Sequence, residues 1–337
     1  MPINKQIHLD NRPDGEAVAG NFKLVSAETP ALADNQVLVR HHYMSLDPYM
    51  RGRMNDSKSY AQPQPLGQVM QGGTAGEVVE SKHPRFAVGD KVVGFGGWQE
   101  YSVVDASQPG ALKKVDTTHV PLSHYLGAVG MPGVTAWYGL VKIIAPKAGE
   151  TMVVTAASGA VGSAFGALAK ARGCRAVGIA GGPDKCRYVV TELGFDACID
   201  HRAPDLREQL AAACPKGVDV YFENVGGAVL EAVWPLLNTH ARVSVCGLIA
   251  QYNDTTPRPG PDLRSVLSKR IMIRGFIILD HAHRFDAFLA DMGAWVRDGK
   301  VKYREDIVEG IARAPEALIG LLQGRNFGKL LVRVAAA

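Results

Sequence analysis

Cysteine is scarce in this sequence and absent from its first half. The chain has 337 residues but only 5 cysteines, and the first of them is Cys174. No C-x-x-C pair occurs, and an odd number of cysteines does not close a disulfide framework. We therefore expect reduced, mostly structural thiols. A zinc site held by thiolates is excluded from the residues that precede Cys174.

Long apolar runs and blocks of like charge are also missing. No stretch of eighteen apolar residues occurs, and the start, MPINKQIHLDNRP, lacks the apolar core of a secretory signal. The 37 basic and 33 acidic residues give a formal net charge of +4. The missing apolar runs predict a cytoplasmic protein, and the charge balance gives no indication of a nucleic-acid or membrane partner. The length and the 47% of hydrophobic residues predict two globular domains.

The most informative segment present is TMVVTAASGAVGS, residues 151–163. An apolar β-type run leads into a turn of small residues and a helical run at 161–172, and a second β-type run follows at 175–180. This is the βαβ context of a dinucleotide site, in which glycines let a pyrophosphate approach the backbone. Ala157 stands where the first glycine of G-x-G-x-x-G is usual. We predict a phosphate cradle over Gly159, Ala160, Val161 and Gly162, the alternative being a strand–turn–helix without ligand.

The distribution of strand and helix patterns changes near residue 125. Before it, β-type runs at 36–43, 74–80, 91–95 and 100–104 are separated by Gly, Pro and Asp turns. After it, strands predicted at 152–156, 176–180, 197–200, 218–223, 241–246 and 271–278 alternate with helices predicted at 161–172, 185–193, 206–213, 229–237 and 285–298. This alternation predicts an α/β fold with a doubly wound parallel sheet. A last helix at 315–322 and strand at 329–334 could complete either domain.

The end of the second strand of this βαβ unit indicates which nicotinamide cofactor binds. An NAD site places an acid there, roughly twenty residues past the glycines, to bind the ribose hydroxyls. In GIAGGPDKCR that acid is replaced by Ala180, Gly181 and Gly182, and Lys185 follows. The small residues leave room for a 2′-phosphate and the lysine neutralises it, so we predict NADPH. Taken alone, Lys185 could be a solvated lysine at a helix start.

The sequence offers no convincing metal site. Histidines in the first half lack thiolate or carboxylate partners at ligand spacing, and we expect surface or turn positions for His41, His42, His83, His119 and His124. The isolated H-x-H motif of His281 and His283 is also not enough to indicate a metal site. No Ser-Tyr-Lys arrangement is evident for reducing a plain ketone. Hydride addition to the β-carbon of an enone is easier, because a hydrogen-bond donor stabilises the enolate.

The chain resembles the zinc-independent medium-chain dehydrogenase/reductases in seven motifs that occur in the same order. Within that family it is most similar to the group of NADPH-dependent 2-alkenal, prostaglandin and curcumin reductases. The motifs are YMSLDPYMRGRM (43–54), GMPGVTAWYGL (130–140), AASGAVGS (156–163), YFENVGG (221–227), CGLIAQYN (246–253), RGFII (274–278) and GRNFGKLLV (324–332). The resemblance implies a GroES-like β-rich catalytic domain, 1–125 completed by 305–337, and a Rossmann NADPH-binding domain, 126–304. It also implies an active site in the cleft against the nucleotide domain, and homodimers.

The same resemblance implies roles for individual residues. Pro48 and Tyr49 would lie over the nicotinamide end, and Gly181 and Lys185 would serve the 2′-phosphate. The family often has a tyrosine near that phosphate where this chain has His201, whose help would weaken as pH rises past its pKa, about 6.5 when unperturbed. Further implied cofactor contacts are Asn224, Cys246, Tyr252, Phe276, Ile277, Ile278 and Asn326.

Two tyrosines are the catalytic candidates. Tyr252 follows the strand at 241–246, and ligands gather at the carboxyl ends of strands in open α/β sheets. Its phenol is a donor at neutral pH, because an unperturbed tyrosine has a pKa of about 10. It could bind the nicotinamide ribose or the substrate carbonyl, and it could protonate the enolate. Tyr49 is the second; if its segment is extended, Asp47 and Arg51 share its face. For those two we expect a structural ion pair.

These inferences predict an NADPH-dependent reductase of small α,β-unsaturated aldehydes and ketones, which delivers hydride to the β-carbon and a proton to the α-carbon. A quinone reductase on the same fold is the near alternative. A non-catalytic NADPH-binding regulatory protein is the alternative from another class, and it would leave the motif around Tyr49 without a task.

Overall fold

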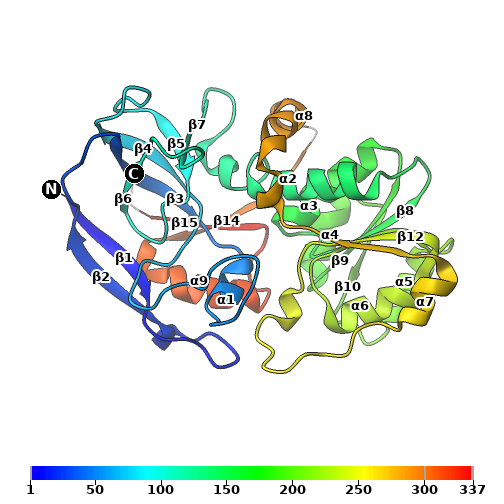
Figure 1. Ribbon diagram of the computed structural model, residues 1–337. Helices are drawn as coiled ribbons and strands as arrows, with labels where there is room; N and C mark the ends of the chain where they lie inside the picture. Colours follow the sequence, from blue (N-terminus) through cyan, green and yellow to red (C-terminus); the bar gives the residue numbers. More distant parts are fainter. Residues whose placement is uncertain (1, 300, 335–337) are drawn as a thin grey trace. The chain divides into compact units, whose positions relative to one another are not determined.

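The computed structural model describes residues 2–299 and 301–334. The chain divides into two compact units (Figure 1). Unit 1 contains the described residues up to Leu126, Glu305–Asn326 and those from Leu330 onward. Unit 2 contains Gly127–Arg304 and Phe327–Lys329.

Unit 1 is built on antiparallel strands. Strands β1 (Ile3–Leu9) and β2 (Phe22–Glu28) form a ladder of their own. A seven-stranded sheet runs in the order β14-β15-β3-β4-β5-β7, with β6 also paired to β3. Its strands are β3 (Gln36–Ser45), β4 (Thr74–Ser81), β5 (Lys91–Gly94), β6 (Tyr101–Asp105), β7 (Leu112–Lys114), β14 (Glu305–Glu309) and β15 (Lys329–Arg333).

The C-terminal segment completes the core of unit 1. β15 pairs with β3, and Leu318 of α9 packs in one buried cluster with Ile7, Met50 and Val332. The helical elements of this unit are η1 (Ala19–Asn21), α1 (Tyr49–Arg53), η2 (Leu122–Leu126), η7 (Ile311–Arg313) and α9 (Ala314–Leu322). The residues after 305 therefore stabilise the unit formed by the start of the chain.

Unit 2 is a parallel six-stranded sheet in the order β10-β9-β8-β11-β12-β13. The strands are β8 (Thr151–Thr155), β9 (Arg175–Ala180), β10 (Ala197–Asp200), β11 (Val218–Glu223), β12 (Leu237–Val245) and β13 (Met272–Gly275). All five side chains of β8 are buried, as expected of a strand covered on both faces. The order reverses between β8 and β11, which is the switch point of a Rossmann sheet.

Helices cover both faces of this sheet (Figure 1). One apolar cluster joins Val154 and Phe222 to α2, α3, α4 and α8, and the other joins Val153 and Tyr221 to α5, α6 and α7. The helical elements are α2 (Met131–Tyr138), η3 (Gly139–Ile144), α3 (Ala160–Ala171), α4 (Pro183–Thr191), α5 (Leu206–Ala213), α6 (Gly227–Val233), η4 (Trp234–Leu236), η5 (Ile249–Gln251), α7 (Leu263–Lys269), η6 (Ile278–Arg284) and α8 (Phe285–Arg297). The predicted fold class is confirmed.

Two predicted elements of unit 2 were placed wrongly. The strand expected over 271–278 ends at Gly275, because its partner β12 ends at Val245 and the ladder stops with that pair. The helix expected over 229–237 is α6 followed by the turn η4, which contains Pro235. A proline removes a helix hydrogen bond, and Leu237 already opens β12.

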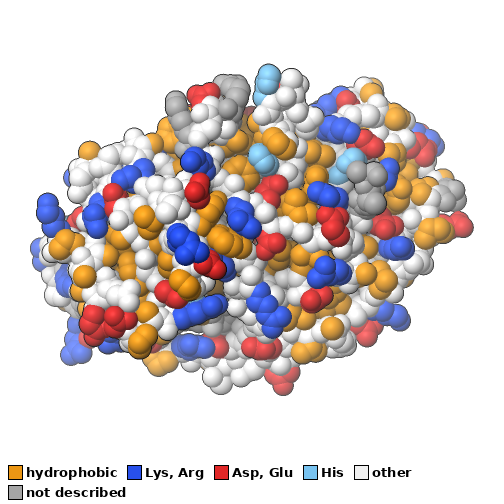
Figure 2. All heavy atoms as spheres, turned by 180° about the vertical axis from the view of Figure 1, so that it is seen from behind, with side chains coloured by type: hydrophobic (Ala, Val, Ile, Leu, Met, Phe, Trp, Pro, Cys, Tyr) orange, Lys and Arg blue, Asp and Glu red, His pale blue; other side chains and the backbone are white. Residues whose placement is uncertain are grey.

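The surface carries mixed charge. Figure 2 shows basic and acidic side chains interspersed among hydrophobic and neutral ones over the face that it draws. Within the described residues, no helix combines the length and the apolar character needed to cross a bilayer.

Candidate functional site

Every strand of the unit 2 sheet ends next to predicted site residues. Because all six strands are parallel, their carboxyl ends lie along one edge of the sheet. The residues that follow these ends are Gly159, Ala160, Val161 and Gly162 after β8, Gly181 and Lys185 after β9, His201 after β10, Asn224 after β11, Cys246 and Tyr252 after β12, and Phe276, Ile277 and Ile278 after β13. In open α/β sheets this edge is where ligands bind.

The turn between β8 and α3 is tight and depends on Gly162. Ala156 adopts a left-handed conformation, with φ of 52°, and its carbonyl accepts a hydrogen bond from Gly159 N at 2.8 Å. A Cβ on Gly162 would lie 2.3 Å from the Ala156 carbonyl oxygen, whereas a Cβ on Gly159 would lie 3.1 Å from it. Gly162 is therefore required for the turn itself.

The start of α3 is shaped for an anion. No side chain caps the helix, and its first turn contains Ala160 and Val161 but no acidic residue. Its first backbone N–H groups are thus left for another acceptor, at the positive end of a 12-residue helix. The absence of side-chain bulk at Gly159 gives such an acceptor access. These residues fit a pyrophosphate.

Gly181, Lys185 and His201 meet at the ends of β9 and β10. Ala180 and Asp200 are register partners, so the residues that follow them are neighbours. A Cβ on Gly181 would lie only 2.9 Å from His201 Nε2. Burial, with the charges of Arg202 and Lys185, lowers the pKa of His201 below its ordinary value. The imidazole is therefore a neutral donor at pH 7.

Asn224 is fixed between β8 and β11. Its backbone N–H donates to Thr155 Oγ1 at 2.7 Å, and its side-chain amide donates to the Thr155 carbonyl at 2.8 Å. The Thr155 hydroxyl in turn donates to Glu223 Oε1 at 2.9 Å. This chain of hydrogen bonds ties the ends of the two central strands together beside the cradle.

Glu223 organises this centre, although sequence reasoning did not single it out. Its buried carboxylate also accepts hydrogen bonds from the Tyr221 hydroxyl and from Val225 N, each at 2.6 Å. Burial, and secondarily Glu223, raises the pKa of Cys246 to about 12. Cys246 is therefore a neutral thiol rather than a nucleophile. An acid at a strand end, in YFENVGG, was the available signal.

Tyr252 directly follows η5 and points back to the end of β12. Its hydroxyl oxygen accepts a hydrogen bond from Leu248 N at 3.3 Å. A Cβ on Gly247 would lie 3.1 Å from this oxygen and 3.5 Å from the Asn224 carbonyl oxygen. The structure therefore brings Tyr252 and Asn224 to the same place at the edge of the sheet.

The segment after β13 is held by aromatic packing. The ring of Phe276 lies 5.7 Å from that of Tyr138 and 6.4 Å from that of Phe222, between ring centroids. Ile277 directly precedes η6, and the half-buried Ile278 packs on the same cluster as α2 and α3. These contacts fix the position of the backbone here.

Pro48, Tyr49 and Asn326 belong to unit 1. Pro48 precedes α1 and Tyr49 is its first residue, packed on the cluster of α9 with the Arg53 guanidinium carbon 4.9 Å from its ring centroid. Burial, and secondarily Asp47, raises the pKa of Tyr49 well above its ordinary value, so the phenol stays protonated. Asn326 lies half-buried between α9 and β15.

The segment around Tyr49 is helical, not extended. Because α1 begins at Tyr49, the alternation that would place residues 47, 49 and 51 on one face does not apply, and that expectation is wrong. Asp47 accepts a hydrogen bond from the Ser45 hydroxyl. Arg51 donates to Asn55 Oδ1 at 2.6 Å and to the Gly15 carbonyl. These contacts hold α1 in unit 1.

Histidine packing accounts for the H-x-H pair. The ring of His281 stacks on Tyr138 with centroids 4.1 Å apart. Within the part of the chain that the structure describes, no cluster of three or more His, Cys, Asp or Glu side chains could hold a metal ion.

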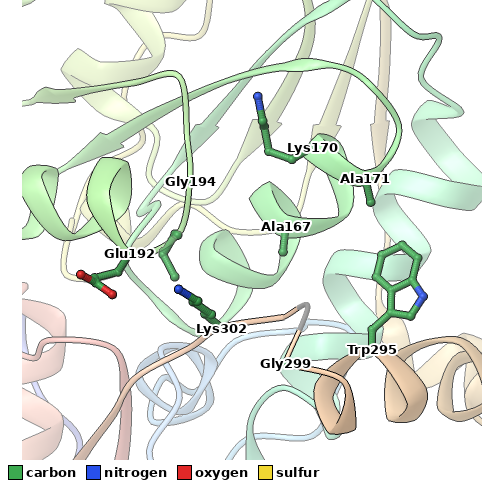
Figure 3. A pocket seen from close by; sticks show the side chains of 9 residues that line it. Ala167, Lys170, Ala171, Glu192, Gly194, Trp295, Gly299 and Lys302 are labelled. Atoms are coloured by element: carbon green, nitrogen blue, oxygen red, sulfur yellow. The ribbon is translucent and has the colours of Figure 1, made fainter.

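Unit 2 contains a pocket of about 500 Å³ (Figure 3). It touches the end of α3, at Ala167, Lys170 and Ala171, whereas the cradle is at the start of that helix. Lys170 donates to Asp196 at 2.8 and 2.9 Å. The remaining lining residues are Glu192, Leu193, Gly194, Trp295, Gly299 and Lys302. None of these is a predicted site residue.

Two family profiles match this chain. One is described as the N-terminal domain of oxidoreductase and matches residues 5–112. The other is described as zinc-binding dehydrogenase and matches residues 160–294.

Several characterised proteins are similar over nearly the whole length. NADPH-dependent curcumin reductase of Escherichia coli is 51% identical, covering 98% of this chain and 97% of its own. NADP(+)-dependent 2-alkenal reductase of Nicotiana tabacum is 39% identical, covering 98% of each. Among solved structures, CurA of Vibrio vulnificus in complex with NADPH has a TM-score of 0.93 at 50% identity, covering 99% of this chain and 100% of its own.

Proposed function

The chain belongs to the medium-chain dehydrogenase/reductase family, in the group of the 2-alkenal, prostaglandin and curcumin reductases, and from this premise we propose that it reduces the C=C bond of α,β-unsaturated aldehydes and ketones with NADPH. The observation that carries the proposal is full-length similarity to two reductases named for such compounds, curcumin and 2-alkenals. A plant (+)-pulegone reductase, 37% identical over 99% of this chain, supports the same substrate class.

NADPH is the cofactor, and the residues of unit 2 fit it. The open turn at Gly159 and the uncapped start of α3 suit the pyrophosphate. The acid that would select NADH is absent after β9, where Gly181 stands with Lys185 and His201 nearby. The related CurA structure contains NADPH.

The proposed mechanism assigns the proton and the enolate to side chains. When bound, NADPH supplies the hydride that adds to the β-carbon. Tyr252 donates a hydrogen bond to the substrate carbonyl oxygen, where negative charge develops, and transfers its proton to the enolate oxygen. The enol then tautomerises, which places a proton on the α-carbon, and the tyrosinate regains its proton from solvent. Tyr49, kept protonated by its burial, is a second neutral donor and packing surface for the substrate.

The test is an NADPH-consumption assay with alkenals, enones, quinones and simple ketones. We expect turnover with enals and enones, and a saturated product that retains its carbonyl group. Turnover of quinones alone would favour the quinone reductase. Tight NADPH binding with no turnover of any enone would overturn the proposal and favour a non-catalytic binding protein.

We further propose that the protein is a homodimer joined through β13. This strand forms an edge of the sheet within the described residues, and all four of its residues are exposed. Exposed apolar side chains flank the edge, with Leu267 80% and Ile273 42% accessible. Two such edges related by a two-fold axis run antiparallel and can pair their free N–H and C=O groups.

A further inference from the structure

Arg202 occupies the corner between β9 and β10, and no prediction from the sequence included it. It follows His201, two residues beyond the end of β10. A Cβ on Gly181 would lie 3.4 Å from Arg202 Nη2 and 3.5 Å from its Nε, and a Cβ on Gly182 would lie 3.6 Å from its Nη1. The guanidinium therefore lies along the two glycines that replace the acid of an NAD site.

Asp200 fixes the backbone on both sides of this corner. Its Oδ1 accepts hydrogen bonds from Gly182 N at 2.9 Å and from Arg202 N at 3.0 Å. Although burial acts against ionisation, these two bonds lower the pKa of Asp200. The carboxylate is thereby engaged with backbone N–H groups, and the base of the Arg202 side chain is held in place.

The guanidinium itself keeps its donors available. Among residues 2–299 and 301–334, no hydrogen-bond acceptor is found for the Arg202 side chain, which is exposed. The charges of Arg202 and Lys185 both act on His201 and disfavour its protonation. Two cations and a neutral donor thus share one corner, and Asp200, on which the charge of Arg202 also acts, already accepts two backbone hydrogen bonds there. An added dianion would relieve this repulsion.

We propose that Arg202 is a specificity-determining residue whose guanidinium binds the 2′-phosphate of NADPH, together with Lys185 and His201. The inference rests on the cofactor of the proposed function. A planar guanidinium with several N–H donors matches the oxygens of a phosphate better than a single ammonium does. Arg202 also stands where the side chain of an NAD-type acid would otherwise point, so it favours the phosphorylated ribose over the free hydroxyl.

Binding of two fragments to the full-length protein tests the proposal without catalysis. Isothermal titration calorimetry would compare 2′,5′-ADP with 5′-ADP for the wild type, Arg202→Ala and Arg202→Lys. We expect Arg202→Ala to weaken binding of 2′,5′-ADP about tenfold, since a hydrogen bond to a charged group is lost, and to leave 5′-ADP nearly unchanged. Arg202→Lys should recover part of the loss, because the charge remains without the fork.

The matched control is Arg207→Ala on α5, since Arg207 is also exposed and basic but does not contact the glycine corner. It should bind both fragments as the wild type does. Equal weakening of both fragments by Arg202→Ala would mean that the guanidinium stacks on the adenine, and unchanged affinity would mean that it stays in solvent; either result overturns the inference. A wild type that binds neither fragment nor NADPH would instead overturn the proposed cofactor.

Discussion

At the residue scale, a substitution of Tyr252 tests the proposed chemistry most directly. Its hydroxyl lies beside Asn224 at the carboxyl edge of the sheet, and Leu248 N fixes its position. If it donates to the enolate oxygen, Tyr252→Phe should lower kcat for an enone about 100-fold, the lower end of a general acid contribution, with little change in the Kd for NADPH. Tyr101→Phe in β6 is the control. Unchanged kcat across pH would make water the proton source.

His41 was expected at a surface or turn position, but that expectation is wrong, because the residue lies buried in β3. It carries a second prediction at this scale, about acid stability. Its Nδ1 donates to the Gln99 carbonyl at 2.8 Å, and its Nε2 accepts from the Ser102 hydroxyl at 2.9 Å, so the ring is satisfied in its neutral form. Burial lowers its pKa from 6.5 to about 4. An unfolded chain therefore binds the proton first as pH falls from 6.5 towards 4, and the free energy of unfolding decreases over that window.

The size of this loss follows from the pKa difference. A shift from 6.5 to about 4 corresponds to about 3 kcal/mol, at 1.36 kcal/mol per pKa unit. Urea unfolding at pH 7 and pH 4 should show that the wild type loses about 3 kcal/mol more than His41→Gln. His119→Gln, at an exposed position, should behave as the wild type. An equal loss in His41→Gln would mean that other groups cause the acid sensitivity.

At the scale of elements, the two glycines between β8 and α3 have different roles: Gly162 is needed for the turn, and Gly159 gives a ligand access to the backbone. A Cβ at Gly162 would collide with the Ala156 carbonyl at 2.3 Å, so Gly162→Ala should destabilise the fold by about 1–3 kcal/mol, as overpacking does. Gly159 has φ of −81°, which alanine accepts, and only a 3.1 Å contact. Gly159→Ala should therefore melt as the wild type does and bind NADPH at least tenfold more weakly, if the pyrophosphate approaches there. Unchanged affinity would place the pyrophosphate elsewhere.

The elements that could be predicted from the sequence are those defined by a hydrophobic pattern or by turn residues. The sequence predicted β8, β9 and the glycine turn that follows β8, because strands that are covered on both faces form nearly continuous apolar runs. β2 was missed, since most of its residues are exposed and no alternation appears, and the five-residue α1 is too short to show a helical period.

Site residues divide in the same way. Tyr252 was proposed from the order of elements alone, because it follows the carboxyl end of a strand, whereas Asn224 was proposed only through the family resemblance. Arg202 could be placed only through the register of β9 and β10, which no single segment encodes. Glu223 had a signal, as an acid at a strand end, but its role depends on hydrogen bonds to residues of β8 and β11.

At the scale of the whole molecule, the proposed dimer forms by pairing of the edge strand β13 of two copies. The substitution Ile273→Lys places a charge on this edge, and the charge would lose its water when two copies pair. Charged side chains on edge strands prevent such association in natural proteins. Size-exclusion chromatography with light scattering should give twice the 36.1 kDa chain mass for the wild type and the single mass for Ile273→Lys. Val88→Lys replaces a side chain that is 68% exposed in unit 1 and should remain dimeric. Near-ultraviolet circular dichroism would show that the monomer is folded, and a folded Ile273→Lys dimer would place the interface on another surface.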